Sequence, residues 1–255
     1  MNHIVTESKD GILRIEINRP EKKNALTAVM YQAMADAIKA AEADAKVRVV
    51  LIHGKPDLFT AGNDLQDFLD NPPRDDNRPV FQFLYGISQA QKPIVAAVAG
   101  AAVGIGTTML LHCDLVYAAP SARLQLPFVN LGLVPEAGSS LLLPALAGYQ
   151  RAAALLMLGE PFSAQTAKDI GLVTEVVPEG ELLDTAMAQA KKLAAKPAAS
   201  LRLTKRLMKQ GQMAAVGEQI KLESGHFGER LNSPEAKEAF SAFLQKRKPD
   251  FSRFD

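Results

Sequence analysis

Apolar and polar positions along the chain predict an alternation of strands and helices. Leu13, Ile15 and Ile17 are separated by polar residues, and this period of two is typical of a half-buried strand. The apolar run over residues 47–53 predicts a second strand, and the β-rich run over residues 94–99 suits a strand buried on both faces. Shorter strands are expected over residues 115–118, 123–126 and 173–177.

Apolar residues at helical spacing occur between and after these strands. Met30, Met34 and Ile38 recur every four residues in an alanine-rich segment, which predicts a helix with one buried face. Ser163 is a suitable N-cap for a helix that runs to Ile170. Further helices are expected over residues 104–112, from residue 181 onward, and from Ser233-Pro234.

The order of these elements predicts the organisation of the chain. Strand–helix alternation followed by helices alone is typical of one α/β core with a helical tail. We expect the core over residues 1–195 and the C-terminal helical region over residues 196–255. The polar, proline-rich residues 71–79 predict a mobile surface loop between helices.

The composition argues against several classes of function. The chain has 255 residues and a formal net charge of +1, so no general field favours nucleic acid or an anionic membrane. Glycines interrupt the apolar stretch over residues 94–111, which favours a buried strand, turn and helix over a membrane span. Cys113 is the only cysteine, which excludes an intrachain disulfide, and no spacing of histidines or carboxylates indicates a metal site. Because no secretory pattern is visible either, we expect a cytoplasmic protein.

Two glycine-bearing segments carry most of the chemical information. Residues 59–65 and residues 100–106 each follow an apolar run and precede a helical stretch. Small residues let a ligand approach the backbone closely, and two N–H groups converging on one oxygen form an oxyanion hole. Glu136 follows within residues 131–138. Together these features indicate a site that stabilises an enolate and moves a proton.

The succession of motifs resembles the crotonase, or enoyl-CoA hydratase/isomerase, family. The matching pieces occur in family order and are Asn18-Arg19-Pro20, Asn24-Ala25-Leu26 and residues 59–65, 92–98, 100–106, 113–115, 131–139 and 171–173. The resemblance implies a crotonase-like spiral of ββα units with a C-terminal helical trimerisation region, in a homotrimer or a dimer of trimers. It also implies an acyl-CoA thioester as substrate and no cofactor, because coenzyme A is part of the substrate.

The resemblance also assigns roles to individual residues. The N–H groups of Ala61 and Ile105 match the two oxyanion donors, although family members more often have glycine at the second position. Glu136 matches a catalytic acid and base. The positions that match contacts to coenzyme A or the acyl chain are Ala25, Leu26, Ala61, Gly62, Asn63, Asp64, Leu65, Gly104, Phe128, Phe243 and Lys246. In the family, the last two contacts often come from a neighbouring subunit.

The acidic positions distinguish among the reactions of the family. Family hydratases use two glutamates, and the matching positions here hold Thr108 and Phe128, which carry no carboxylate. Glu136 matches the single glutamate of several Δ3,Δ2-enoyl-CoA isomerases, so we expect a 3-enoyl-CoA double bond to move to the 2-position, as in the β-oxidation of fatty acids. The alternatives are an enoyl-CoA hydratase, which is a lyase, another crotonase-type reaction, or a non-catalytic acyl-CoA-binding protein.

Structural roles are alternatives for several of these residues. Glu136 could merely favour the first turn of the following helix, and Asp64 could be only a helix cap. The cationic residues 246–248 could be a solvated helix end. We expect His53 and His112, which lie in apolar surroundings, to be structural.

Overall fold

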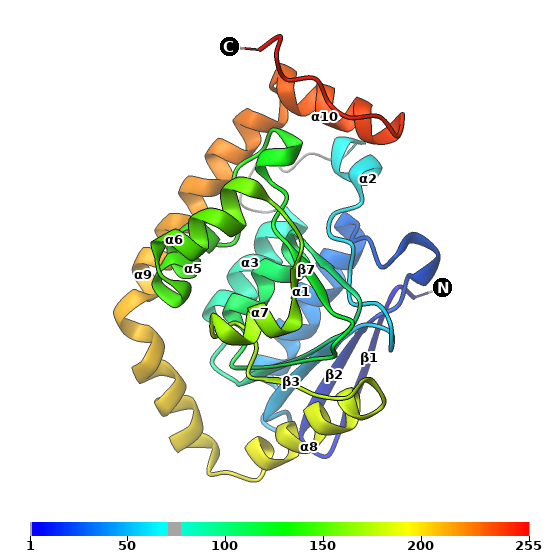
Figure 1. The fold of residues 1–255 in the computed structure, drawn as a ribbon. Coiled ribbons are helices and arrows are strands. Elements are labelled where there is room, and N and C mark those ends of the chain that lie inside the picture. Colours follow the sequence, from blue (N-terminus) through cyan, green and yellow to red (C-terminus); the bar gives the residue numbers. More distant parts are fainter. Residues whose placement is uncertain (1, 71–77, 255) are drawn as a thin grey trace.

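Two β-sheets surrounded by helices make up the fold in the computed structural model, which describes residues 2–70 and 78–254 (Figure 1). The strands are β1 (Ile4–Lys9), β2 (Ile12–Ile17), β3 (Val49–His53), β4 (Ile94–Val98), β5 (Ala101–Val103), β6 (Leu115–Ala118), β7 (Arg123–Gln125), β8 (Phe162–Ser163) and β9 (Glu175–Val176). The larger sheet has the order β1-β2-β3-β4-β6-β9, and the smaller sheet has the order β5-β7-β8. β1 pairs antiparallel with β2, and the following neighbours in the larger sheet pair in parallel.

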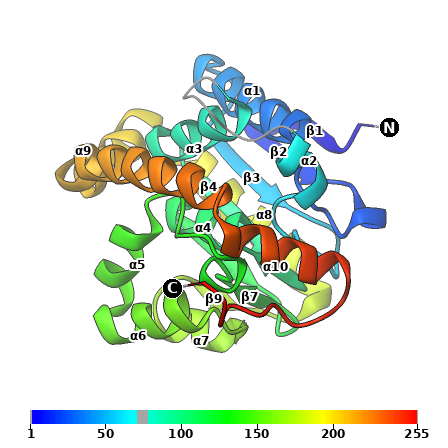
Figure 2. The ribbon, with the colours of Figure 1, turned by 90° about the horizontal axis from the view of Figure 1, so that it is seen from above.

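Helices flank both sheets. The α-helices are α1 (Ala28–Ala43), α2 (Leu65–Asp70), α3 (Pro79–Gln89), α4 (Ile105–Thr108), α5 (Ser139–Ala147), α6 (Tyr149–Ala153), α7 (Ala164–Asp169), α8 (Leu182–Ala194), α9 (Ala198–Leu231) and α10 (Pro234–Leu244). Shorter 3-10 and π segments are η1 (Pro20–Lys22), η2 (Met109–His112), η3 (Val129–Leu131), η4 (Ala154–Leu158) and η5 (Glu179–Glu181). The 34-residue helix α9 runs along the side of the fold, and α10 follows at its end (Figures 1 and 2).

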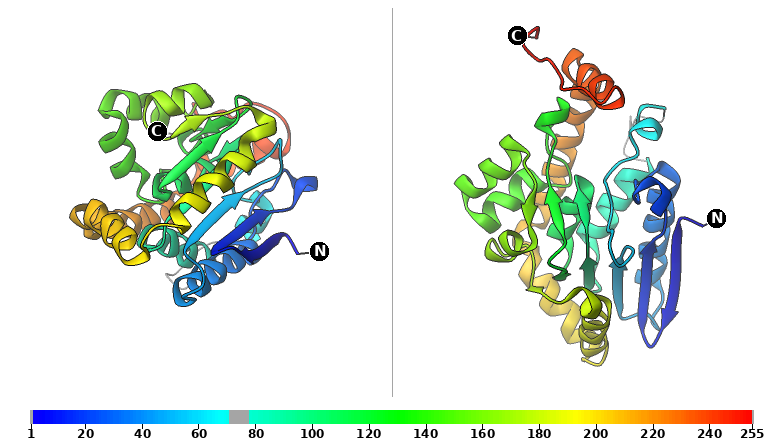
Figure 3. Two further views of the ribbon diagram at one scale, coloured as in Figure 1. Left: turned by 90° about the horizontal axis from the view of Figure 1, so that it is seen from below. Right: turned by 45° about the vertical axis from the view of Figure 1, so that its right-hand side comes forward.

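The larger sheet is covered on both faces because alternate residues of its inner strands point to opposite sides. Val50 and Ile52 of β3 join the main core cluster with α1 and α3. Val49 and Leu51 join a second cluster with α8, which lies across the strands on the other face (Figure 3). Every residue of β3 and β4 is buried, as expected for parallel strands covered on both sides.

The smaller sheet places the two glycine-bearing segments beside each other. Thr60 forms an isolated parallel bridge with Ala102 of β5. Thr60 N–H donates to Ala101 O at 2.8 Å, and Val103 N–H donates to Thr60 O at 3.0 Å. β5 then continues through Gly104 into α4. Backbone hydrogen bonds therefore fix the loop at Thr60 relative to the start of α4.

Most predicted elements are confirmed, with shorter bounds in several cases. The runs over residues 47–53 and 94–99 correspond to β3 and β4. The Ser163 cap is also confirmed, because the Ser163 hydroxyl accepts the Thr166 N–H at 3.0 Å. The predicted helix over residues 104–112 is only partly correct: α4 is a single turn, and the tighter helix η2 replaces it after Thr108.

Other expectations have different outcomes. The hydrophobic pattern did not predict β1, β5 and β8, and β5 and β8 are only three and two residues long. Residues 71–77 of the predicted loop lie outside the described residues, and Pro79 begins α3 instead of belonging to that loop.

The C-terminal helices pack on the same core as the preceding residues. Val216, Ile220 and Phe227 of α9, with Phe240 of α10, belong to the main core cluster. The boundary at residue 195 stays a prediction, and the hydrophobic core is continuous across it. None of the described helices combines the length and the apolar character needed to cross a membrane.

Candidate active site

Glu136 lies in the irregular segment between η3 and α5, and only 8% of the residue is exposed. Its Oε1 atom has no hydrogen-bond partner in the described parts of the chain. Burial first, and then the negative charge of Glu223, raises the pKa of Glu136 to about 8. The residue in the N-cap position of α5 is Gly138, which has no side chain, and Glu136 makes no capping bond to that helix among the described residues. Glu136 is therefore a buried proton-binding group with no capping bond of its own.

The two residues after Glu136 form a tight turn. Ala137 has a φ of 62° and Gly138 has a φ of 71°, and this left-handed conformation is uncommon for alanine. His112, the last residue of η2, lies 2.7 Å through its Nε2 atom from Ala137 O. Because a carbonyl can only accept, Nε2 carries the proton. Burial lowers the pKa of His112 to about 4, so the ring is neutral and fixes the turn without adding charge. The expected structural role of His112 agrees with this geometry.

Glu223 of α9 also binds the same turn. Its Oε2 atom accepts the Gly138 N–H at 2.6 Å, and its Oε1 atom accepts the Ser140 N–H at 2.9 Å. The Ser140 hydroxyl donates to Oε1 at 2.5 Å and accepts from Gln219 Nε2 at 2.8 Å. Glu223 is itself 5% exposed. A carboxylate of α9 is thus bonded to the turn that carries Glu136.

Hydrogen-bond directions show which N–H groups of the first glycine-bearing segment are free. The N–H of Ala61 donates to Lys23 O at 3.0 Å, and the N–H of Gly62 donates to Thr60 Oγ1 at 3.1 Å. The donor role expected of Ala61 is therefore wrong for this structure, because its N–H is already used within the loop.

The next N–H along the segment, that of Asn63, has no hydrogen-bond partner in the described residues. Asn63 forms a parallel bridge with Leu26. In that bridge Leu26 N–H donates to Gly62 O at 2.8 Å, and Asp64 N–H donates to Leu26 O at 2.9 Å. Since the two bonds use the peptides on either side of Asn63, its own N–H points away from Leu26. Asn63 replaces Ala61 as the candidate donor.

The second candidate donor is at the start of α4. Ile105 is the first residue of that helix, where the N–H has no partner within the helix. Gly104 precedes it with a φ of 56°, and Gly104 N–H donates to Gln125 O at 2.9 Å. Gly106 packs so closely on Thr60 that a Cβ atom would lie 2.7 Å from Thr60 Cγ2. This contact brings the start of α4 against the Asn63 segment.

Tyr31 of α1 bonds to Asn63 and is within electrostatic range of Glu136. Its hydroxyl donates to Asn63 Oδ1 at 2.5 Å, and its ring lies against Phe83 with 5.6 Å between the centroids. Burial first, and then the charge of Glu136, raises the pKa of Tyr31 well above its ordinary value. Glu136 is thus close enough to act electrostatically on a hydroxyl bonded to Asn63. We therefore assign the free donor and the buried carboxyl to one candidate site.

The two positions that match hydratase glutamates are buried and uncharged. Thr108 is 0% exposed and Phe128 is 4% exposed. The Thr108 hydroxyl makes no hydrogen bond among the described residues. Of the three positions that match catalytic glutamates of the family, Glu136 is the one that carries a carboxyl group.

Asp64, another predicted contact, has structural partners. Asp64 Oδ2 accepts from Arg19 Nη1 at 2.6 Å, and Asp64 Oδ1 accepts the Asp67 N–H at 3.1 Å in the first turn of α2. Burial opposes its ionisation, but these bonds prevail and lower the pKa of Asp64. Arg19 also donates to Ala25 O at 2.9 Å. The capping role of Asp64 is confirmed, and contacts of Ala25, Leu26 and Leu65 with coenzyme A stay predictions.

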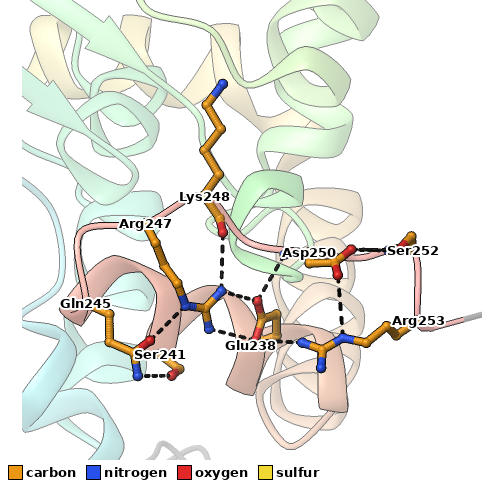
Figure 4. Close-up of polar contacts among 8 residues, drawn as sticks. All are labelled: Glu238, Ser241, Gln245, Arg247, Lys248, Asp250, Ser252 and Arg253. Carbon is orange, nitrogen blue, oxygen red and sulfur yellow. Dashed lines mark hydrogen bonds and ion pairs between the residues drawn. The ribbon is translucent and has the colours of Figure 1, made fainter.

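The C-terminal segment is folded back by Glu238 (Figure 4). Arg247 bonds to both oxygens of the Glu238 carboxylate, at 2.5 and 3.0 Å, and the Asp250 N–H donates to Oε1 at 3.0 Å. The hydrogen bond from Arg247 holds the pKa of Glu238 at about 2. Phe243 is 62% exposed, and Lys246 is exposed beside it. These two candidate contacts with coenzyme A are thus available on the surface of this copy of the chain.

Comparison with known proteins places the chain in a family. The family profile described as enoyl-CoA hydratase/isomerase matches residues 7–253. This chain belongs to the enoyl-CoA hydratase/isomerase family. It is 34% identical to the 1,2-epoxyphenylacetyl-CoA isomerase of Escherichia coli K12, over 99% of each protein. It is also 34% identical to a probable enoyl-CoA hydratase of Bacillus subtilis strain 168, over 98% of this chain and 99% of that protein.

Solved structures of the enoyl-CoA hydratase/isomerase family have the same fold. The crystal structure of an enoyl-CoA hydratase/isomerase from Pseudoalteromonas atlantica T6c is 41% identical, with a TM-score of 0.95, and the match covers 98% of this chain and 100% of that chain. The crotonase fold is thereby confirmed. Because the relatives are named as isomerases and as hydratases, the reaction of this chain has to be argued from its site.

The sequence patterns did not identify Glu223 and Tyr31 as members of the site. Glu223 occupies the buried face of α9 between Ile220 and Phe227. A lone carboxylate in an apolar stripe at helical spacing is the signal that could have revealed it, because a buried charge needs partners. Tyr31 next to Met30 gave no such signal.

Proposed function

We propose that this chain is an enoyl-CoA isomerase that moves the double bond of a 3-enoyl-CoA to the 2-position. The observation that carries the proposal is the buried Glu136, with its pKa near 8, at a site where Thr108 and Phe128 supply no second carboxylate. Hydration by the family's usual pair of glutamates needs two such groups. An isomerisation needs one group that first takes a proton and then returns it.

Glu136 in its ionised form removes a proton from C2 of the substrate. The electron pair of that C–H bond moves toward the thioester carbonyl and gives a dienolate. The N–H groups of Asn63 and Ile105 donate to the thioester oxygen, and removal of one such donor typically costs about 3 kcal/mol of transition-state stabilisation. Protonated Glu136 then returns the proton at C4, so the remaining double bond lies between C2 and C3 and no atom is gained or lost.

The environment of Glu136 suits both halves of this transfer. A carboxylate in water is too weak a base for the α-proton of a thioester, and burial strengthens it as a base by disfavouring its charged form. A pKa near 8 also means that the group gives the proton back less readily to water than an ordinary glutamic acid does. His112 is neutral, so its hydrogen bond to Ala137 adds no positive charge that would lower the pKa of Glu136.

Contacts with the coenzyme A part complete the proposal. Phe243 and Lys246 are exposed on the C-terminal segment, and we propose that they contact coenzyme A bound to a neighbouring copy in a trimer. Arg247 is engaged by Glu238, so Lys246 is the better candidate for a phosphate contact.

The test uses 3-enoyl-CoA and 2-enoyl-CoA thioesters with the wild-type protein and Glu136→Gln. We expect the wild type to convert the 3-enoyl-CoA to the 2-enoyl-CoA, and the variant to lose about 10²- to 10⁴-fold in kcat. Binding of an unreactive saturated acyl-CoA by both proteins is the control for folding. Rapid hydration of the 2-enoyl-CoA by the wild type would instead identify a hydratase. Binding of both thioesters without turnover would identify an acyl-CoA-binding protein.

A further inference from the structure

The turn that carries Glu136 is held by a second buried carboxylate, Glu223, whose hydrogen bonds within the described parts of the chain do not involve the candidate oxyanion donors. Glu223 reaches the turn from α9, more than eighty residues later in the sequence. Its bonds end on the N–H groups of Gly138 and Ser140 and on the Ser140 hydroxyl. It therefore acts on the backbone just after Glu136.

The bonding pattern identifies the charge state of Glu223. Three donors point at its two oxygens, and an ionised carboxylate accepts all of them, whereas a protonated one would have to donate as well. Burial raises the pKa of Glu223, and the bonds from Ser140 and Gly138 oppose that effect. No described lysine or arginine forms an ion pair with it. The negative charge is thus stabilised by hydrogen bonds alone.

The other groups around the turn do not cancel this charge. Tyr31 faces Glu136 from α1 and stays protonated. His112 faces Ala137 from η2 and is neutral. The charges of Lys205 and Lys209 of α9 act on His112. They lower its pKa in addition to the larger effect of burial. Glu223 is the ionised group whose charge acts on Glu136 from α9.

Two consequences follow for Glu136. The strained turn at Ala137 and Gly138 is fixed by a bond from His112 to Ala137 and by a bond from Gly138 to Glu223, and this restricts the backbone that carries Glu136. A negative charge close to Glu136 also disfavours a second negative charge there.

We propose that Glu223 is a positioning residue for proton transfer, which fixes the turn carrying Glu136 and places a negative charge on the backbone two residues beyond it. The proposal depends on the proposed isomerase function only in the experiment that measures isomerase activity. The bonds of Glu223 go to the Gly138 and Ser140 N–H groups and the Ser140 hydroxyl. Its effect passes entirely through Glu136.

The first test is a comparison of Glu223→Gln with Glu218→Gln, an exposed glutamate on the same helix. Proteins labelled with ¹³C at the glutamate carboxyl are titrated by NMR, and the Glu136 signal is assigned by its absence in Glu136→Gln. We expect the titration midpoint of Glu136 to fall by about one pH unit in Glu223→Gln and to stay unchanged in Glu218→Gln. An unchanged midpoint in folded Glu223→Gln would overturn the proposal.

The second test is the pH profile of kcat/KM for the 3-enoyl-CoA. In Glu223→Gln the ionisation that controls activity should move to lower pH by the same amount, together with a lower kcat at the plateau. A lower plateau without movement of the profile would show that Glu223 is only structural. If the wild type has no isomerase activity, the proposed function fails while the NMR titration still decides the role of Glu223.

Ser140→Ala is the variant to use if Glu223→Gln does not fold. It removes the hydroxyl donor and keeps both backbone bonds to Glu223. Glu223 then loses part of its stabilisation as an anion, so the midpoint of Glu136 should fall in the same direction by a smaller amount. A midpoint that rises or stays constant would contradict the proposal.

Discussion

Replacing Glu136 with glutamine should stabilise the protein at alkaline pH while it removes the proposed activity. The folded protein holds the Glu136 proton more tightly than the unfolded chain does, because the pKa of the buried group is about 8 and its ordinary value is 4.5. The stability that this group contributes is therefore complete below pH 4.5 and is lost as the pH rises to 8. At about 1.4 kcal/mol per pH unit, the loss amounts to roughly 4 to 5 kcal/mol, and glutamine does not undergo it.

The assay is urea unfolding of wild type and Glu136→Gln at a series of pH values between 4 and 9. The quantity to plot is the difference in the free energy of unfolding between the two proteins, because ionisations common to both largely cancel. We expect this difference to grow in favour of the variant between pH 4.5 and 8 and then to become constant. Parallel stability curves for the two proteins would refute a buried, proton-holding Glu136.

Three further variants test other parts of the structure. Ile105→Pro removes one N–H at a first helical position, where proline is tolerated. With the 3-enoyl-CoA as substrate, kcat should fall about 10²- to 10³-fold, whereas the control Ile105→Val should keep most of the activity. Gly62→Ala should lower the free energy of unfolding in urea by about 2 kcal/mol or more, because Gly62 has a φ of 91° and a Cβ atom would lie 2.8 Å from a backbone oxygen. Its control Gly180→Ala, in open space, should lower it by less than about 0.5 kcal/mol. Glu238→Gln should speed tryptic cleavage at Arg247, and equal cleavage rates would contradict the role of Glu238 in holding the C-terminal segment.

The sequence alone predicts the elements whose pattern is local. The alternation around Ile15 and the apolar run over residues 94–99 identify β2 and β4, because each of these hydrophobic patterns is visible within a few neighbouring positions. Glu136 is found through motif order. In contrast, β5 and β8 are too short to show a period.

The choice of oxyanion donor depends on geometry that no motif contains. Successive N–H groups in an extended segment point in different directions, so the motif match that assigned the Ala61 N–H could not show which N–H in residues 61–63 is free. The bond from Ala61 to Lys23 decides the question in favour of Asn63. The role of Glu223 could not be predicted for a similar reason, because its partners Gly138 and Ser140 are far away in sequence.

The dependence of the Glu136 turn on α9 has a consequence for synthesis of the chain on the ribosome. The segments that supply Asn63, Ile105 and Glu136 emerge well before Glu223, whose bonds close the turn at Gly138. Domains are made from the N-terminus onward, so a nascent chain that ends before α9 holds the substrate loops but lacks the clamp on its acid and base. The proton transfer proposed above should therefore require that α9 has emerged and packed on the turn.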